Sequence, residues 1–256
     1  MFFDRAPLWV LFLGTIAMVE VALEAGIRLG RRRQRRAEGK FEVSAAMIGA
    51  TMGLLAFMLA FTFNGAAGRH EVRKGLVVEE TNSIEKTWLR AGLLAEPYRS
   101  NARDLIRDYV DVRAKAGTAG MEEEEVGGQS EALQERLWAV TEEAGRKDSG
   151  SITTGLYVQS LNEVFDVYLK RVMYDSRYRV PTPIWVTLYL LLAVGMLMIG
   201  TQSGLSGSRH LAIELAVAIS FSLVLVVVAD LDRPKEGMIN VSQQAMQELQ
   251  TKMHTR

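Results

Sequence analysis

Three acidic side chains that stand inside long apolar stretches are the residues with the clearest capacity for chemistry. Glu20 and Glu24 are one helical turn apart and would share a helix face, and Glu214 lies one turn into another apolar stretch. A charge at membrane depth is costly and usually faces protein or water, so these carboxylates would mark a water- or ion-accessible seam. The alternative is that Glu24 pairs with Arg28 and that Glu214 lies close enough to a helix end to reach water.

The sequence contains no recognisable catalytic or metal-binding motif. His70, His210 and His254 stand far apart, without the His/Glu spacing of a metal site or a Ser, His and Asp motif. Cysteine is absent, which excludes disulfides, thiolate nucleophiles and cysteine metal sites. We therefore expect no enzyme, no cofactor and no bound metal. A divalent-cation site in the glutamate run 122–125 is disfavoured, because consecutive carboxylates lack the alternating spacing of a calcium loop.

Four long apolar windows would position these residues. They cover residues 7–27, 43–63, 183–201 and 211–229. A bilayer core of about 30 Å needs roughly 20 helical residues, and lipid offers no partners to an exposed backbone, so each window is predicted to be a transmembrane helix. A cleaved signal peptide is disfavoured for the first window, because its basic cluster follows the apolar run instead of preceding it.

The predicted fold is all-α, a four-span integral membrane protein with a helical soluble domain between spans 2 and 3. The expected domains are a transmembrane hairpin (1–63), the soluble domain (64–182), a second hairpin (183–229) and a tail (230–256). Helical spacing of apolar residues covers 69–91, 98–116, 130–144 and 152–173. The segment "AGTAGMEEEEVGGQS" (116–130) is predicted to be a solvated loop, and "GTQSGLSGS" (200–208) a turn between spans.

The charged residues argue against nucleic acid as a partner, but they do not decide on which side of the membrane the soluble domain lies. Lysine and arginine total 30 and so do aspartate and glutamate, so no net charge attracts nucleic acid. Seven basic residues between Arg28 and Lys40 favour a cytoplasmic first connection by the positive-inside rule. A comparable number flanks the opposite membrane ends, so the side that the soluble domain faces stays open.

The second apolar window carries two patterns of its own. Gly53, Phe57 and Phe61 follow at four-residue intervals and share one helix face. A phenylalanine stripe is usually ordinary packing or lipid contact, but in a symmetric ring of subunits it would line an apolar constriction that gates ions by dewetting. The window is also rich in small residues that allow another helix to approach closely, namely Ala45, Ala46, Gly49, Ala50, Gly53, Ala56 and Ala60.

The run "FMLAFTFNGAAGRHEVRKGLVVEETNSI" (57–84) resembles the second-helix segment of bestrophins, and more closely the bacterial bestrophin-like domain family. The matching features are Phe57-x-x-Ala60-Phe61 and the charged helix that follows through Arg69 and Glu71. The tail "DLDRPKEGMINVSQQ" (230–244) is also similar. The shared plan of two helices, a helical soluble domain and two helices covers most of the chain.

The resemblance implies a homopentameric ion channel whose second helix lines the pore. Phe57 and Phe61 would be neck residues with Gly53 at the third neck position, where a glycine departs from the family pattern and leaves that ring unfilled. The charged continuation would line a wet vestibule or pair between subunits through Asn64, Arg69, Glu71, Arg73 and Lys74. An acidic cluster like the eukaryotic calcium clasp is not recognisable after the fourth span, so calcium activation is not expected.

The function expected from these features is a bestrophin-like ion channel, homo-oligomeric with a pentamer favoured. Its partners would be the lipid bilayer, further copies of itself and small inorganic ions, with no nucleic acid. We expect it in the cell membrane, which the resemblance makes a bacterial inner membrane. The alternative is a non-conducting multi-pass membrane scaffold or regulator that uses its helical domain for protein interaction, and an enzyme ranks third.

Overall fold

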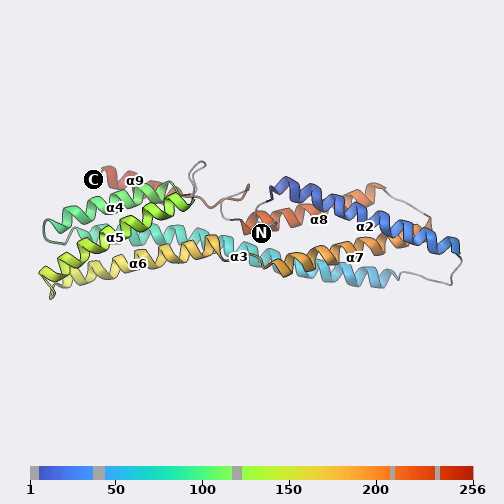
Figure 1. Cartoon of the computed structure of the whole chain (residues 1–256), viewed down its shortest axis with the longest axis horizontal. Coiled ribbons are helices and arrows are strands. Elements are labelled where there is room, and N and C mark those ends of the chain that lie inside the picture. The colour runs from blue at the N-terminus through green and yellow to red at the C-terminus, as the bar shows by residue number, and fades with distance from the viewer. Residues whose placement is uncertain (1–5, 37–43, 117–122, 208–210, 234–236, 256) are drawn as a thin grey trace. The chain divides into compact units, whose positions relative to one another are not determined.

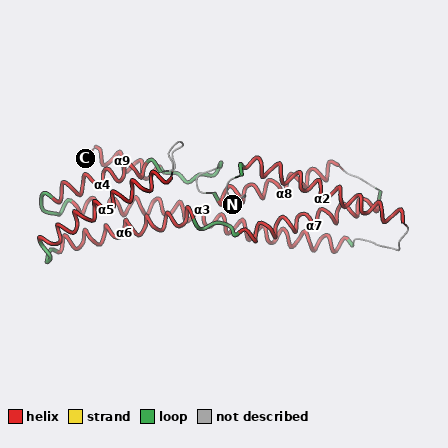
Figure 2. Tube along the Cα trace, in the orientation of Figure 1, coloured by secondary structure: helices red, strands yellow, loops and turns green. Residues whose placement is uncertain are grey.

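The described part of the chain consists of helices and their connections. The computed structural model describes residues 6–36, 44–116, 123–207, 211–233 and 237–255, and within these ranges no strand occurs (Figure 2). The helices are α2 (Leu8–Arg36), α3 (Ala45–Ala91), α4 (Tyr98–Ala114), α5 (Glu123–Lys147), α6 (Ile152–Ser176), α7 (Thr182–Ser206), α8 (Leu211–Asp232) and α9 (Gln244–Thr255). The all-α prediction is confirmed for the residues that the structure describes.

Four helices, α2, α3, α7 and α8, are long and apolar enough to cross a membrane, as predicted. Residue 43, the predicted start of the second span, lies outside the described residues, and α3 starts at Ala45. It continues without a break to Ala91, which confirms that the apolar span and the charged segment form one helix. Helix α7 has Pro183 in its first turn, where the missing proline N–H leaves no helical hydrogen bond unmade.

The chain folds into two compact units. The first unit contains Met1–Arg69 and Arg179–Ile239, and so α2, the first part of α3, α7 and α8. The second contains His70–Tyr178 and Asn240–Arg256, and so the rest of α3 with α4, α5, α6 and α9 (Figure 1). The domain boundaries expected from the sequence stay a prediction, because compactness within one chain does not show where lipid begins.

In the first unit, glycine allows α2 and α7 to pack with their backbones in contact. A Cβ added to Gly26 would lie 2.3 Å from the carbonyl oxygen of Leu197, and one added to Gly200 would lie 2.2 Å from that of Leu23. Real Cβ atoms do not come this close to a carbonyl oxygen, so any residue other than glycine at these two positions would force the helices apart. Gly26 and Gly200 each have a second glycine four residues later, which is the small-xxx-small pattern of membrane helix pairs.

The expected turn at "GTQSGLSGS" is wrong for residues 200–206, and Ser208 lies outside the described residues. Helix α7 continues through Gly200 and Gly204 to Ser206, and Gly207, with φ of 70°, ends it. A Cβ on Gly204 would lie 2.4 Å from the carbonyl oxygen of Ile27 on α2. The glycines of this segment therefore serve close helix packing, which outweighs their weak intrinsic preference for a helix.

The small residues of the second span face outward from the chain. All seven are exposed, namely Ala45, Ala46, Gly49, Ala50, Gly53, Ala56 and Ala60. A Cβ added to Gly49 or Gly53 would meet no atom within 4 Å. The side of α3 that packs inside the first unit is a different one, carrying Leu55 and Leu59, which are at most 4% exposed. No described part of the chain packs closely against this small-residue face.

The second unit is a helical bundle with its own apolar core. The buried residues of this core include Ile84, Ile106, Leu137 and Leu161, one from each of α3, α4, α5 and α6. Helix α6 begins at a regular cap, because the Ser151 hydroxyl accepts a hydrogen bond from the Thr154 backbone N–H at 3.2 Å. The predicted helices of this region are therefore present, with bounds that differ by a few residues.

Two segments of the second unit differ from the expectation. The glutamate-rich segment was predicted to be a loop, but α5 begins at Glu123 and includes "EEEVGGQS"; residues 117–122 lie outside the described part. Carboxylates at a helix N-terminus are favoured by the helix dipole, which offsets the two glycines. In the tail, α9 was not predicted at all. Its Met246, Leu249 and Met253 are at most 3% exposed and pack into the core beside α4 (Figure 1).

Candidate functional site

The two phenylalanines of the second span stack on one exposed face of α3. The ring centroids of Phe57 and Phe61 are 4.7 Å apart with the planes tilted by 52°. Their side chains are 59% and 64% exposed, so no described part of the chain covers them. Gly53 lies one turn earlier on the same face and is also exposed. The three predicted neck positions thus form one uncovered row on α3.

The same face of α3 turns polar after Phe61. Asn64 is exposed, and steps of three and four residues keep it in line with the phenylalanines. On the part of α3 that belongs to the second unit, Glu71 and Lys74 are exposed and pair with each other, with Nζ 3.1 Å from Oε2. Because both side chains remain mostly in solvent, such a pair contributes little to stability. Both charges are therefore available to ions or to another molecule.

Arg69 is bound within the chain. Its Nε and Nη2 atoms donate to Oδ1 of Asp232 at 3.1 and 2.9 Å, and Asp232 is 3% exposed. The other oxygen of Asp232 accepts the backbone N–H of Val180 at 2.8 Å. One buried carboxylate thus joins α3, the end of α8 and the segment that leads into α7. The expectation for Arg69, vestibule water or a partner in another subunit, did not include this intrachain partner.

Arg73 is placed differently from the expected vestibule position. Its side chain is 1% exposed, and Nε and Nη2 donate to the carbonyl oxygens of Tyr174 and Tyr178 at 3.2 and 3.3 Å. The Asp175 carboxylate lies 3.9 Å from Nε. The last carbonyls of a helix have no partner within it, so an arginine that reaches them stabilises the end of α6. Arg73 therefore does not belong to the exposed face of α3.

The carboxylates inside the spans do not share one environment. Glu24 forms an ion pair with Arg28, with Nε 2.9 Å from Oε1, as the alternative reading expected. The Oε1 atom of Glu20 is buried and has no hydrogen-bond partner among the described residues. Glu214 is 6% exposed in the first turn of α8, a position where the helix dipole favours a negative charge. No hydrogen bond found in the described residues joins Glu20 to the other two, so the shared seam stays a prediction.

A buried ion network in the second unit escaped the sequence analysis. Glu80 is 0% exposed and accepts Nε of Arg113 at 2.7 Å and Nη1 of Arg171. Arg171 also donates to Oε1 of Gln243 at 2.7 Å. The Glu80 network, as we call these four residues, therefore joins α3, α4, α6 and the segment before α9. Its members lie up to 163 positions apart, so no local spacing could have revealed it.

Arg113 keeps its positive charge inside the Glu80 network. Burial by itself would lower the pKa of Arg113, but the Glu80 carboxylate beside it outweighs burial and raises that pKa, so the guanidinium stays charged. One carboxylate against two guanidinium groups leaves the network with an excess positive charge. The arrangement is structural and contains no nucleophile or proton-transfer pair. It supports the position of α3 within the second unit.

The similar tail segment "DLDRPKEGMINVSQQ" begins with buried ionic side chains. Asp230 is 1% exposed and accepts the backbone N–H of Met238 on both oxygens, at 3.1 and 3.2 Å. Gly237, with φ of 133°, packs against this carboxylate. Arg233 is 4% exposed and donates to the Ala6 carbonyl oxygen at 2.6 Å. These residues close the end of the first unit, and the density of charges directly after an apolar span is the sequence signal that could have found them.

Among the described residues, no group of three His, Cys, Asp or Glu side chains is arranged to hold a metal ion. His210 and residue 122 of the glutamate run lie outside the described part of the chain. His254 contacts Asp111 on α4, with Nε2 2.9 Å from Oδ1, and so takes part in docking α9.

Comparison with known proteins identifies the family. The family model of the Bestrophin-like domain matches residues 14–246. A solved bacterial bestrophin homologue from Klebsiella pneumoniae is similar, with 15% identity, 96% of each chain covered and a TM-score of 0.66. A crystal structure described as that of a membrane protein has 12% identity, 97% of each chain covered and a TM-score of 0.69. A point variant of the Klebsiella pneumoniae homologue has 12% identity, covers 97% of this chain and 100% of its own, and has a TM-score of 0.67.

A search of curated proteins found no match. At such low identity the solved structures show the fold alone, whereas the family model covers most of the sequence. The chain therefore has the bestrophin fold and belongs to the Bestrophin-like domain family.

Proposed function

We propose that this chain forms a homo-oligomeric ion channel, with a pentamer favoured, whose pore is lined by α3. The observation that carries the proposal is the exposed pair of stacked rings at Phe57 and Phe61 on an uncharged part of that helix. Around a shared axis, five such pairs would form an apolar neck that gates ions by dewetting. Gly53 leaves the third ring of the neck unfilled.

Two further features support an inward-facing row over a lipid-facing one. The exposed small residues beside the phenylalanines, such as Ala56 and Ala60, would let the helices of neighbouring subunits approach closely. A lipid-facing surface needs to stay apolar, whereas here Asn64 follows Phe61 directly on the exposed face. Asn64, Glu71 and Lys74 would then contact vestibule water.

Arg69 and Arg73 have other roles in this proposal. Arg69, held by Asp232, would fix α3 against α8 below the neck, and the buried Arg73 would hold α3 to the end of α6. The permeant species would be small inorganic ions. Glu71 and Lys74 carry opposite charges, so they favour neither anions nor cations. The protein would reside in the cell membrane, in a bacterium the inner membrane, in contact with lipid and with its own copies.

Planar-bilayer recording on purified protein tests the neck. We expect a conductance that changes several-fold in Phe57→Ala and in Phe61→Ala, because each removes a ring from the constriction. Phe63→Ala is the matched control, since Phe63 is 42% exposed on another side of the same helix. Its conductance should match the wild type. A wild-type protein that is silent at all pH and calcium conditions would instead favour the non-conducting scaffold.

Oligomeric state is an independent requirement of the proposal. Light scattering in a mild detergent should give a mass several times that of the 28.5 kDa chain. A monomer or a simple dimer would leave no ring for the phenylalanines to line. Such a result would refute the proposal that Phe57 and Phe61 line an apolar neck, even if a conductance were recorded.

A further inference from the structure

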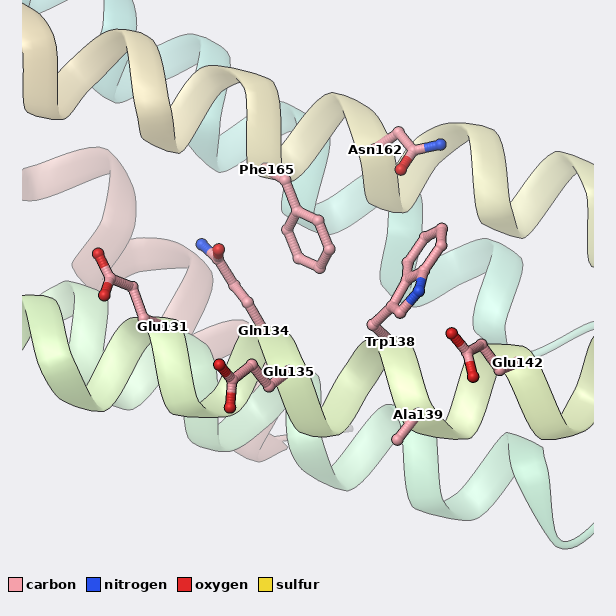
Figure 3. Close-up of a pocket in the computed structure, with 8 residues that line it drawn as sticks. All are labelled: Glu131, Gln134, Glu135, Trp138, Ala139, Glu142, Asn162 and Phe165. Carbon is pink, nitrogen blue, oxygen red and sulfur yellow. The ribbon is translucent and has the colours of Figure 1, made fainter.

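A groove on the second unit combines two aromatic rings with a row of carboxylates. It lies between α5 and α6, has a volume of about 660 Å³ and is lined by Glu131, Gln134, Glu135, Trp138, Ala139, Glu142, Asn162 and Phe165. Trp138 and Phe165 extend toward each other from the two helices, and the carboxylates lie along α5 (Figure 3). Its volume falls in the range of about 300–1,000 Å³ that is usual for small-molecule sites.

The two aromatic rings of the groove lie at an angle to each other. The centroids of Trp138 and Phe165 are 6.4 Å apart and their planes are tilted by 55°, so the rings form two sides of an angle. Trp138 is 37% exposed, although large aromatic side chains are normally buried further. The faces of such rings carry partial negative charge and attract a cation within about 6 Å of the centroid.

The charges around the rings have one sign. Glu131, Glu135 and Glu142 line the groove, and none of the described lining residues is basic. Glu142 is paired with Arg146, with Nη2 2.8 Å from Oε2, and Glu131 lies 3.4 Å from the Tyr168 hydroxyl. Glu135 takes part in no hydrogen bond or ion pair among the described residues. The groove therefore keeps at least one uncompensated carboxylate, that of Glu135, about one helical turn before Trp138 on α5.

We propose that this groove binds a small organic ammonium compound. The rings would contact the methyl or methylene groups around the positive nitrogen, and Glu135 would supply the opposite charge. A bare metal ion fits less well, because the described residues offer no cluster of three ligands and aromatic faces provide no oxygen donors. The site lies on one unit and is independent of the proposed channel activity.

Calorimetric titration of the full-length protein in maltoside detergent tests the proposal, with choline as the probe. The control ligand is 3,3-dimethyl-1-butanol, which has the shape of choline but no charge. We expect one choline site per chain, and binding of the uncharged analogue weaker by about 10-fold or more, because it makes no cation–π contact or ion pair. Equal binding of the two compounds would overturn the proposal.

Variants locate the site. Trp138→Leu and Glu135→Gln should each weaken choline binding by about 3- to 10-fold, since each removes one of the two attractions. Glu143→Gln is the matched control: Glu143 is exposed on the same helix but does not line the groove, so its affinity should be unchanged. Because Glu135 is exposed, its substitution leaves folding intact, and unchanged choline binding in Glu135→Gln and Trp138→Leu would refute the assignment. Absence of choline binding at tens of millimolar would refute it as well.

Discussion

The two parts of α3 differ in whether they bury charge. In the first unit the buried side of the helix carries apolar residues such as Leu55, Leu59 and Ala66, and in the second it carries Arg73 and Glu80 beside apolar residues such as Ile84. Both parts leave the other side of the helix exposed. One continuous helix therefore meets two different kinds of interior.

The difference follows from what each interior has to provide. In lipid there is little hydrophobic drive to bring helices together, so the first unit depends on close backbone packing through Gly26 and Gly200. In the second unit an apolar core forms in water, and a charge can be buried only where partners converge on it. Arg113 and Arg171 meet that condition for Glu80. Close backbone contacts at glycines thus distinguish the first unit, and a carboxylate shared by two buried arginines distinguishes the second.

Replacing Glu80 by alanine should have the largest effect. It would leave two buried guanidinium groups without their carboxylate, which costs about 3–5 kcal/mol when a buried pair loses one partner. The measurement is thermal unfolding of the full-length protein in detergent, together with trypsin digestion of the second unit. Glu79→Gln is the matched control, because the neighbouring Glu79 is 52% exposed and pairs with Lys170 at 3.4 Å. It should change stability by less than about 1 kcal/mol, and an equal loss in both variants would contradict the ionic account.

Gly200→Ala should have the next largest effect, confined to the first unit. The added methyl group would lie 2.2 Å from the Leu23 carbonyl oxygen and push α2 away from α7, at a cost of about 1–3 kcal/mol. Unfolding by detergent titration measures it. Gly14→Ala on α2 is the control, since a Cβ there meets no atom within 4 Å and alanine favours a helix. Wild-type stability in Gly200→Ala would show that the helices do not depend on this contact.

Protonation of Asp111 at acidic pH should have the smallest effect of the three, a partial loss of the stability with which α9 docks onto α4. Burial acts to raise the pKa of Asp111, but hydrogen bonds from His254 and Gln250 outweigh it and lower that pKa. A carboxyl with a lowered folded pKa stabilises docking above its unfolded pKa, and this contribution is lost as pH falls through the folded value.

Hydrogen exchange of the α9 amides, corrected for intrinsic rates, measures this effect between pH 6 and pH 3. Protection should fall over this interval in the wild type. Asp111→Asn removes the titrating group and should abolish the part of the pH dependence that comes from docking. A wild-type profile in that variant would show that another group controls α9.

The periodic features of this protein could be read directly from its residues. Continuous apolar windows predicted the four spans, and helical spacing over 69–91 predicted the charged helix that forms the second part of α3. The pairing of Glu24 with Arg28 also followed from a spacing of four residues. These features succeed because each depends on neighbours within one helix, where geometry is set by 3.6 residues per turn.

The failures have a common cause. Glycine suggested a turn at 200–208 and a loop that extended over 123–130, but packing against α2 and carboxylates at a helix N-terminus outweighed that local preference. Vestibule water or a partner in another subunit was expected for Arg73, whereas its partners Tyr174 and Tyr178 lie about a hundred residues away in the same chain. A local pattern contains no information about such a partner.

Sequence alone therefore determined that this chain is an all-helical, four-span protein with Gly53, Phe57 and Phe61 in one row on its second span. Only the tertiary structure decided which charges are bound inside the chain: Arg69 to Asp232, Arg73 to the end of α6, and Glu80 to two distant arginines. The physical reason is that the hydrophobic and helical periods act over a few residues, whereas a buried charge is stable only where the fold brings its partners to it.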